Sequence, residues 1–276
     1  MSIADPGCKI AVIERDIAGY GASGRNGGWC WPEVAGMHTY HAEDPDGAGR
    51  LREAVVATVY RVGEVCEQEG IEADYKLVGG IGIAVDELQA RLAREGIAEA
   101  RAFGFSEEDH YWLPPDELRK RIRVADAVGG TFQNHVAAVN PAKLARGLAE
   151  AVERRGVKVY EQTTVTGVEP GRVQTSHGAV RASRIVLAMN AYKAKLSSHK
   201  RDIIPVYENM IATEPFSDEV WDEIGLIPRG LFADRRRVFT YAQRTADNRI
   251  AIGGRTPRFH YGSRVDPSLD QSAHST

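Results

Sequence analysis

A short apolar run near the start of the chain is followed by a glycine-rich segment, and the pair is suited to binding a nucleotide. The run Ile10-Ala11-Val12-Ile13 ends in Glu14, and the segment is Gly21-Ala22-Ser23-Gly24-Arg25-Asn26-Gly27-Gly28. This order predicts a buried parallel strand with a carboxylate at its tip, then a flexible loop. In a dinucleotide-binding fold such a carboxylate accepts hydrogen bonds from the adenosine ribose, and a glycine-rich backbone can lie close to phosphates or rings.

The spacing before Glu14 differs from the usual pattern. A G-x-G-x-x-G turn normally precedes the ribose-binding carboxylate by roughly 20 residues and itself follows a strand. Thirteen residues precede Glu14, and they contain no such turn. We therefore expect this chain to lack the first strand and the pyrophosphate loop of a nucleotide-binding fold.

Composition sets broad limits on the class of protein. The 276 residues are 43% hydrophobic and 26% charged, with a net charge of −3, which suits a soluble protein of one large or two ordinary domains. The charge gives no argument for binding nucleic acid or a membrane surface. No apolar run approaches the roughly 20 residues of a membrane-spanning helix, and no secretory signal is evident. The three cysteines are too few for a disulfide framework or a zinc site. We expect a cytoplasmic protein, with an oligomeric state that the sequence does not define.

Two other clusters have simple interpretations. Arg235-Arg236-Arg237 follows Asp234 and is predicted to be a solvated turn. His38 and His41 have a spacing that suits a metal on a helix, but Pro32 and Gly36 argue against a helix there, so no metal site is expected.

Periodicity predicts mixed helices and strands. Helices are expected over 50–69, 87–102, 141–155 and 218–224, with a short one from Pro115. Strands are expected over 80–85, 128–132, 157–160, 164–168, 172–175, 179–182, 185–188, 206–213, 239–244 and 249–253. The fold class is therefore α/β: an incomplete Rossmann-like domain (1–75 and 140–200) and an α+β domain with a mainly antiparallel sheet (76–139 and 201–262). The polar tail 263–276 is expected to be disordered.

Four segments carry a family resemblance, which spans about Gly7 to Arg264. They are Ile10–Glu14 with Gly19–Gly28, Asn140-Pro141-Ala142-Lys143-Leu144, Val186–Tyr192, and Thr240–Gly254. Together they resemble the FAD-dependent D-amino-acid oxidase and sarcosine oxidase superfamily, particularly its branch related to gamma-glutamylputrescine oxidase. The resemblance makes the first domain an FAD-binding domain and the second a substrate domain. It also implies that the chain is truncated at both ends, since the family's carboxyl-terminal flavin segment has no counterpart after Arg264.

The resemblance implies a flavoprotein that oxidises the carbon–nitrogen bond of a small-molecule amine or amino acid. A hydride passes to the flavin, and oxygen is the expected final acceptor. The expected cofactor-binding residues are Glu14, Arg15, Ala22, Ser23, Gly24, Arg25, Asn26, Gly27, Gly28, Val165, Ala188 and Asn190. Tyr207, Tyr241 and Arg244 lie on strands expected to cover the flavin, and they are the candidates for lining the catalytic site.

Two alternatives remain open from the residues alone. The chain is either such an oxidoreductase or an inactive truncated fragment that binds no FAD. A nicotinamide-dependent dehydrogenase would explain the strand and Glu14, but it would not explain the Ala-Ser-Gly-Arg-Asn-Gly-Gly loop. No Gly-x-Ser-x-Gly turn or Cys/His pairing suggests nucleophilic catalysis.

Overall fold

The chain divides into two compact units, each built from separated segments. The computed structural model describes residues 7–33, 43–206, 208–236 and 238–255. Unit 1 comprises Met1–Ile17, Val157–Asn209 and Arg255–Thr276, and unit 2 comprises Ala18–Gly156 and Met210–Gly254. The predicted tail 263–276 lies outside the described residues.

Unit 1 contains the predicted strand that ends before Glu14. This strand, β1 (Ala11–Ile13), pairs in parallel with β8 (Lys158–Tyr160), with Val12 opposite Val159. The predicted hairpin region is also present, since β9 (Val165–Glu169), β10 (Arg172–Thr175) and β11 (Gly178–Arg181) form an antiparallel sheet. Two short 3-10 helices follow, η2 (Asn190–Lys195) and η3 (Ser197–His199).

Two predictions for unit 1 are wrong. The run Ile185–Ala188 forms no strand, and Val186 within it is 71% exposed. The strand β1 is present but is not buried, because Val12 is 42% exposed. Both errors have one cause: a parallel strand is buried only when neighbours lie along both edges and layers cover both faces. Among the described residues, β8 is the only neighbour of β1, and none pairs with 185–188.

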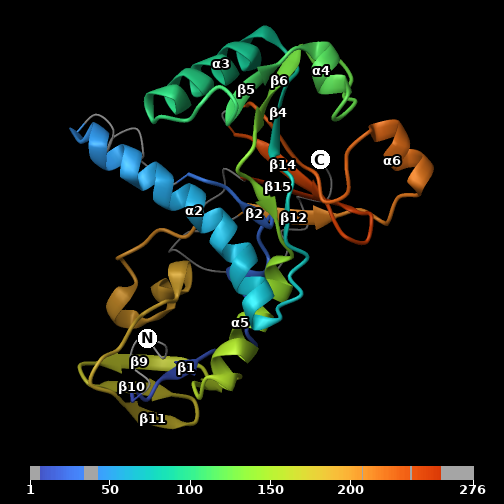
Figure 1. The fold of residues 1–276 in the computed structure, drawn as a ribbon. Helices are drawn as coiled ribbons and strands as arrows, with labels where there is room; N and C mark the ends of the chain where they lie inside the picture. Colours follow the sequence, from blue (N-terminus) through green and yellow to red (C-terminus); the bar gives the residue numbers. More distant parts are fainter. Residues whose placement is uncertain (1–6, 34–42, 207, 237, 256–276) are drawn as a thin grey trace. The chain divides into compact units, whose positions relative to one another are not determined.

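Unit 2 contains a sheet in which seven strands of the described chain lie side by side; we call it the large sheet (Figure 1). In spatial order the strands are β12 (Glu208–Ala212), β15 (Ile250–Arg255), β14 (Thr240–Arg244), β13 (Leu231–Asp234), β4 (Gly80–Ala84), β6 (Gly129–Gln133) and β5 (His110–Leu113). β13 and β4 are parallel, whereas the pairs β14–β15, β13–β14, β4–β6 and β5–β6 are antiparallel. The mainly antiparallel sheet is confirmed. β5 and β13 were not predicted.

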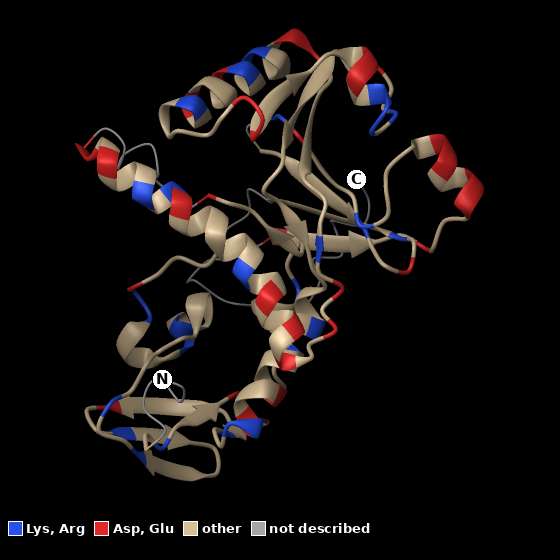
Figure 2. Cartoon of the chain, in the orientation of Figure 1, with Lys and Arg blue, Asp and Glu red and all other residues tan. Residues whose placement is uncertain are grey.

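The large sheet has two chemically different faces, because alternate side chains point to opposite sides. One face carries an apolar core of Ile81, Ile83, Leu113, Leu118, Ile122, Phe132, Trp221 and Leu226. The register places His110, Thr131, Gln133, Tyr241 and Gln243 on the other face, together with Trp112, Leu231, Gly80, Gly82, Ala233 and Gly253. We call this second side the polar face. Figure 2 shows that the helices of this unit carry many charged residues, whereas its strands carry few.

Several helices of unit 2 begin or end at a capping residue. They are α2 (Pro45–Glu69), α3 (Glu87–Ala102), α4 (Pro115–Arg119), α5 (Pro141–Arg154) and α6 (Asp218–Ile224). α2 ends at Gly70 in a left-handed conformation (φ 66°), and the side chain of Asp86 accepts a hydrogen bond from Gln89 N at the start of α3. The helix predictions are confirmed within a few residues.

The compact units divide the chain differently from the predicted domains, because α2 and α5 lie in unit 2. Cys66 on α2 and Ala151 on α5 share a buried cluster with Ile71 and Ala73. Asn140 N donates to the carbonyl of Ala73 (2.7 Å), which fixes the start of α5 to the same segment. Beside it, β7 (Ala137–Ala138) pairs with β2 (Trp29–Cys30) and β3 (Lys76–Leu77).

The cap of α5 is a testable feature of this fold. The side chain of Asn140 accepts a hydrogen bond from Lys143 N (3.1 Å), so Asn140→Ala should lower the free energy of unfolding by about 1 kcal/mol. Asn140→Asp keeps an acceptor and should have a much smaller effect. Urea titrations of the three proteins measure the difference. Equal losses in both variants would show that the cap contributes nothing.

Candidate functional site

The glycine-rich loop is held in shape by the side chain of Asn26. The loop contains a 3-10 turn, η1 (Ala22–Gly24), and Asn26 Nδ2 donates to the carbonyls of Ala22 (3.1 Å) and Ser23 (2.9 Å). Asn26 Oδ1 accepts from Gly28 N (3.0 Å). One side chain therefore organises a turn that has few other restraints, which gives Asn26 a structural role in addition to its predicted cofactor contact.

The loop is attached to the polar face of the large sheet. Gln243 Nε2 donates to the carbonyl of Gly27 (2.6 Å), and Gln243 is 4% exposed. A Cβ atom added at Gly27 would collide with the ring of Tyr241, so only glycine allows this close approach. The carbonyl of Gly28 accepts from Val139 N (2.8 Å). The predicted loop residues and Tyr241 thus lie side by side.

Aromatic rings extend from the loop along the polar face. The rings of Trp29 and Tyr241 meet edge-on at 6.2 Å, and Trp29 and Trp31 lie 5.7 Å apart. A Cβ atom added at Gly80 would lie 2.6 Å from the ring of Trp31, so that ring covers the sheet at Gly80. Two buried polar atoms in this region, Trp29 Nε1 and Gln243 Oε1, have no hydrogen-bond partner among the described residues. Such atoms suit a ligand that supplies the missing bonds.

Arg25, the charged residue among the predicted loop residues, lies at the surface. The guanidinium of Arg25 stacks over the ring of Tyr20 at 4.1 Å from its centroid, and Tyr20 is 44% exposed. The predicted loop residues Ala22, Ser23 and Gly24 form η1 itself.

In unit 1, Glu14 follows β1 directly, as predicted. Its backbone is fixed by Glu14 N donating to the carbonyl of Tyr160 (2.9 Å), and its Oε1 accepts from Asp16 N (2.9 Å). Arg15 forms an ion pair with Asp16 (2.6 Å) and lies 5.7 Å from the ring centroid of Tyr192. The segment after β1 therefore lies next to η2.

Three further predicted cofactor residues also lie in unit 1. Val165 begins β9, Ala188 lies in the irregular segment before η2, and Asn190 begins η2. Asn190 adopts a left-handed backbone (φ 46°), which is uncommon for a residue other than glycine. Their contacts with a cofactor stay predictions.

The three candidates for lining the catalytic site have separate positions. Tyr207 lies outside the described residues. Tyr241 lies on the polar face, and its hydroxyl donates to Met210 Sδ (3.4 Å). Arg244, three residues further along β14, points to the opposite face. There it stacks on Trp221 (4.3 Å) and donates to the carbonyl of Leu226 (2.9 Å) and to Asn248 Oδ1 (2.7 Å). These contacts give Arg244 a structural role.

Sequence reasoning missed Gln243. The signal that could have found it is alternation, because Gln243 lies two residues after Tyr241 on one strand and must share its face. It also missed His110, which is 4% exposed and whose two ring nitrogens have no partner among the described residues.

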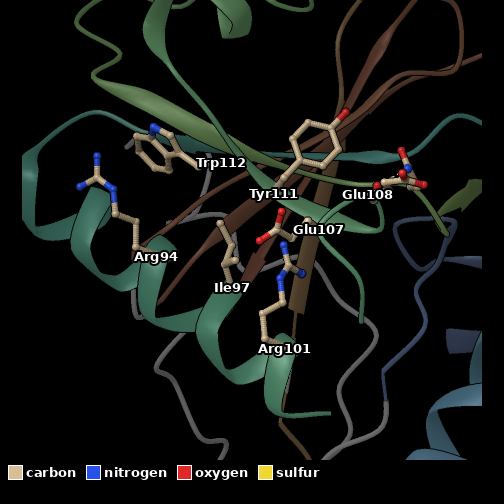
Figure 3. Close-up of a pocket in the computed structure, with 8 residues that line it drawn as sticks. Arg94, Ile97, Arg101, Glu107, Glu108, Tyr111 and Trp112 are labelled. Atoms are coloured by element: carbon tan, nitrogen blue, oxygen red, sulfur yellow. Dashed lines mark hydrogen bonds between the residues drawn. The ribbon is translucent and has the colours of Figure 1, made fainter. Parts of the chain in front are cut away.

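A hollow of about 740 Å³ lies between α3 and β5, away from the predicted residues (Figure 3). Its lining is Arg94, Ile97, Arg101, Glu107, Glu108, Tyr111, Trp112 and Asn134. Arg94 stacks on Trp112 (4.2 Å), and Arg101 donates to the carbonyls of Phe105 and His110. Its arginines are therefore already engaged in holding the fold.

Within the described ranges, no three His, Cys, Asp or Glu side chains gather as they would around a metal ion, and His38 and His41 lie outside those ranges. None of the described helices is both long enough and apolar enough to cross a membrane.

Comparison with known proteins gives a match over nearly the whole chain. Residues 2–275 match the model of the DAO family, described as FAD dependent oxidoreductase. The chain is 31% identical to the probable oxidoreductase OrdL of Haemophilus influenzae (92% of this chain, 61% of that protein). It is 27% identical to the gamma-glutamylputrescine oxidoreductase of Escherichia coli (97% of this chain, 62% of that protein). The chain thus spans less than two thirds of the length of these relatives.

Solved structures share the fold. Glycine oxidase from Geobacillus kaustophilus superimposes with a TM-score of 0.69 at 19% identity, over 98% of this chain and 70% of that one. L-proline dehydrogenase from P. horikoshii gives 0.70 at 18% identity, over 98% and 69%. At this level of identity the likeness shows the fold, and it confirms the predicted fold class.

The contact between the loop and Tyr241 predicts how a methyl group added at Gly27 changes the stability of the protein. Gly27→Ala should lower the free energy of unfolding by about 1–3 kcal/mol, because the added carbon collides with the Tyr241 ring. Adding Tyr241→Ala should recover part of that loss in a double-mutant cycle. Gly49→Ala, where the added carbon meets nothing within 4 Å, is the matched control. Strictly additive losses would show that the two residues do not touch.

The buried His110 predicts a pH-dependent stability. Burial, with Arg235 and Arg101 nearby, lowers its pKa from 6.5 to about 4. The unfolded chain therefore binds a proton between these two values that the folded chain does not, and stability falls as the pH falls through this window. From pH 7 to pH 5 the loss is about 2 kcal/mol. His110→Gln should remove that part of the pH dependence of stability, whereas replacing the exposed His177 by Gln should not. Identical profiles of stability against pH for all three proteins would refute the role of His110.

Proposed function

The chain belongs to the FAD dependent oxidoreductase family, and we propose that it binds FAD and acts in oxidising the carbon–nitrogen bond of a small-molecule amine or amino acid. When bound, FAD accepts a hydride from the carbon that carries the amine. The observation that most supports a bound cofactor is a pair of buried atoms beside the glycine-rich loop, Trp29 Nε1 and Gln243 Oε1, for which the described residues supply no hydrogen-bond partner. The absent side chains of Gly27 and Gly28 let the loop backbone lie close to Tyr241 and Gln243, which places the loop beside these atoms.

The residues of each unit have separate proposed roles. In unit 1, the carboxylate of Glu14 accepts hydrogen bonds from the ribose hydroxyls, with Arg15, Val165, Ala188 and Asn190 contributing further contacts. In unit 2, the backbone of the loop from Ala22 to Gly28 contacts the cofactor, and Asn26 keeps that backbone in its turn.

The polar face supplies the surroundings of the substrate amine. Tyr241 and Trp29 form an aromatic wall that excludes water. The described strand residues of this face include no Asp or Glu to pair with a protonated amine. The face therefore favours the neutral amine, which is the form able to release hydride from its adjacent carbon. Loss of that hydride and of one proton converts the amine to an imine.

We also propose an electron acceptor, a substrate class and a location for the protein. Oxygen is the proposed final electron acceptor, a small amine or amino acid is the proposed substrate, and the cytoplasm is the proposed location. The printed names of the relatives support the substrate class, since gamma-glutamylputrescine, glycine and proline are all amines or amino acids.

Flavin binding is the direct test of the proposed function. The purified chain should bind FAD near one to one, seen as flavin absorbance that stays with the protein on gel filtration. Glu14→Ala should weaken binding at least tenfold, because hydrogen bonds to a charged acceptor contribute about 1.5–3 kcal/mol. Glu153→Ala, an exposed residue on α5, is the control and should bind as the unmodified chain does.

A colourless protein that gains no flavin from added FAD would favour the alternative, a chain without cofactor. Equal affinity in Glu14→Ala and the unmodified chain would remove Glu14 from the site.

A further inference from the structure

Three polar side chains of unit 2 form a hydrogen-bonded chain, and none of them is assigned to the cofactor or the substrate. Tyr60 lies on α2, Asp109 lies directly before β5, and His135 lies between β6 and β7. The Tyr60 hydroxyl lies 2.8 Å from His135 Nδ1, and His135 Nε2 lies 2.8 Å from Asp109 Oδ1. The rings of Tyr60 and His135 meet edge-on at 5.8 Å. We call this set of hydroxyl, imidazole and carboxylate the surface triad.

The carboxylate of Asp109 is held in place by a turn that it closes itself. Asp109 Oδ2 accepts from Ser106 N (2.6 Å), and Asp109 N donates to Ser106 Oγ (3.2 Å). The carbonyl of Asp109 accepts from Asn134 N (2.8 Å), which ties the turn to the residue before His135. Burial raises the pKa of Asp109, but hydrogen bonds from Ser106 and His135 outweigh it and lower that pKa below its usual value. The carboxyl group is therefore ionised at neutral pH.

The ionised carboxylate fixes which nitrogen of His135 carries the proton. A carboxylate only accepts hydrogen bonds, so the N–H of the neutral ring lies at Nε2, toward Asp109. The lone pair of Nδ1 then faces Tyr60, and the Tyr60 hydroxyl donates to it. A hydroxyl beside an imidazole whose other nitrogen is held by a carboxylate is the arrangement that activates a hydroxyl as a nucleophile.

Tyr60 is open to solvent, whereas its two partners are sheltered. Tyr60 is 38% exposed, and the side chains of His135 and Asp109 are each 22% exposed. A reagent can therefore approach the Tyr60 hydroxyl directly from solvent. The hydroxyl of Tyr75 differs, because it donates to the carbonyl of Val59 (3.0 Å), a weak base that does not take up the proton.

We propose that Tyr60 is a modification site whose hydroxyl oxygen attacks the acyl carbon of an activated ester, with His135 as the base and Asp109 as a positioning residue. The Tyr60 oxygen forms a bond to the acyl carbon, and the bond from that carbon to the oxygen of the leaving group breaks. The Tyr60 proton passes to His135 Nδ1 and from there to the leaving group or to water. This acyl transfer involves no oxidation, so it does not depend on the proposed function.

Acetylation of the full chain by p-nitrophenyl acetate tests the proposal. Mass spectrometry of samples quenched over time gives the rate at each tyrosine. Tyr60 should be acetylated at least about tenfold faster than Tyr160, since a positioned base typically contributes that much or more. Tyr160 is the matched control, because it is 50% exposed and has no hydrogen bond to a histidine of the described ranges. A rate at Tyr60 no higher than at Tyr160 overturns the proposal, and this comparison needs only the unmodified chain.

Two variants distinguish an activated Tyr60 from a tyrosine that is only well held. His135→Gln keeps a side chain that can form hydrogen bonds but is no base, so the rate at Tyr60 should fall to about that at Tyr160. Asp109→Asn should also slow Tyr60, because an amide can donate to the imidazole and favour the other tautomer. The rate at Tyr160 should stay the same in both. The exposed His177→Gln is the control and should leave Tyr60 as fast as before.

Urea titrations of the same proteins show whether each variant is folded. Fast acetylation of Tyr60 that persists in a folded His135→Gln overturns the role of His135 as the base. A similar persistence in folded Asp109→Asn overturns the positioning role of Asp109. Because FAD takes no part in the step, a chain that acetylates at Tyr60 but binds no FAD keeps this site and refutes the proposed function.

Discussion

Gln243 Nε2 donates to the carbonyl of Gly27, and this buried hydrogen bond attaches the glycine-rich loop to the large sheet. Removing the amide would leave a buried carbonyl without a donor, which typically costs about 1–3 kcal/mol. The contact also determines which rings lie beside the loop, because it holds Gly27 against Tyr241. Asn26 shapes the loop from within, and Gln243 fixes it from outside.

The two faces of the large sheet have different roles: one contributes stability and the other binding. Neighbouring residues on β14 show the division: Gln243 contacts the loop, whereas Arg244 packs on Trp221 within the apolar side. The apolar face holds the core that keeps the strands in register. The polar face is left with buried groups that have no hydrogen-bond partner in the described part of the chain, namely Trp29 Nε1, Gln243 Oε1, Arg235 Nε and the ring of His110. A folded chain tolerates such groups where a ligand completes them.

Most helices and strands could be predicted because the residues that mark them lie within the element or directly beside it. Asn140-Pro141 marks the start of α5, and the three- and four-residue spacing of apolar residues marks α2. The run Ile185–Ala188 was misleading because an apolar run does not show whether a partner strand lies beside it. β5 was missed because its four residues show no alternation of apolar and polar side chains; its two end residues are buried and its two central ones half-buried. Arg235 was misplaced because a run of arginines usually faces solvent, whereas its parity with Leu231 and Ala233 places it on the sheet. Gln243 could be found only once its strand had a defined face.

The most direct measurement is amide hydrogen exchange of the loop peptide 22–28 in the full chain, with and without saturating FAD. The account predicts slower exchange in this peptide when FAD is present and unchanged exchange in α6, which packs under the opposite face of the sheet. Loop exchange that stays the same at saturating FAD would contradict the central claim that this loop holds the cofactor.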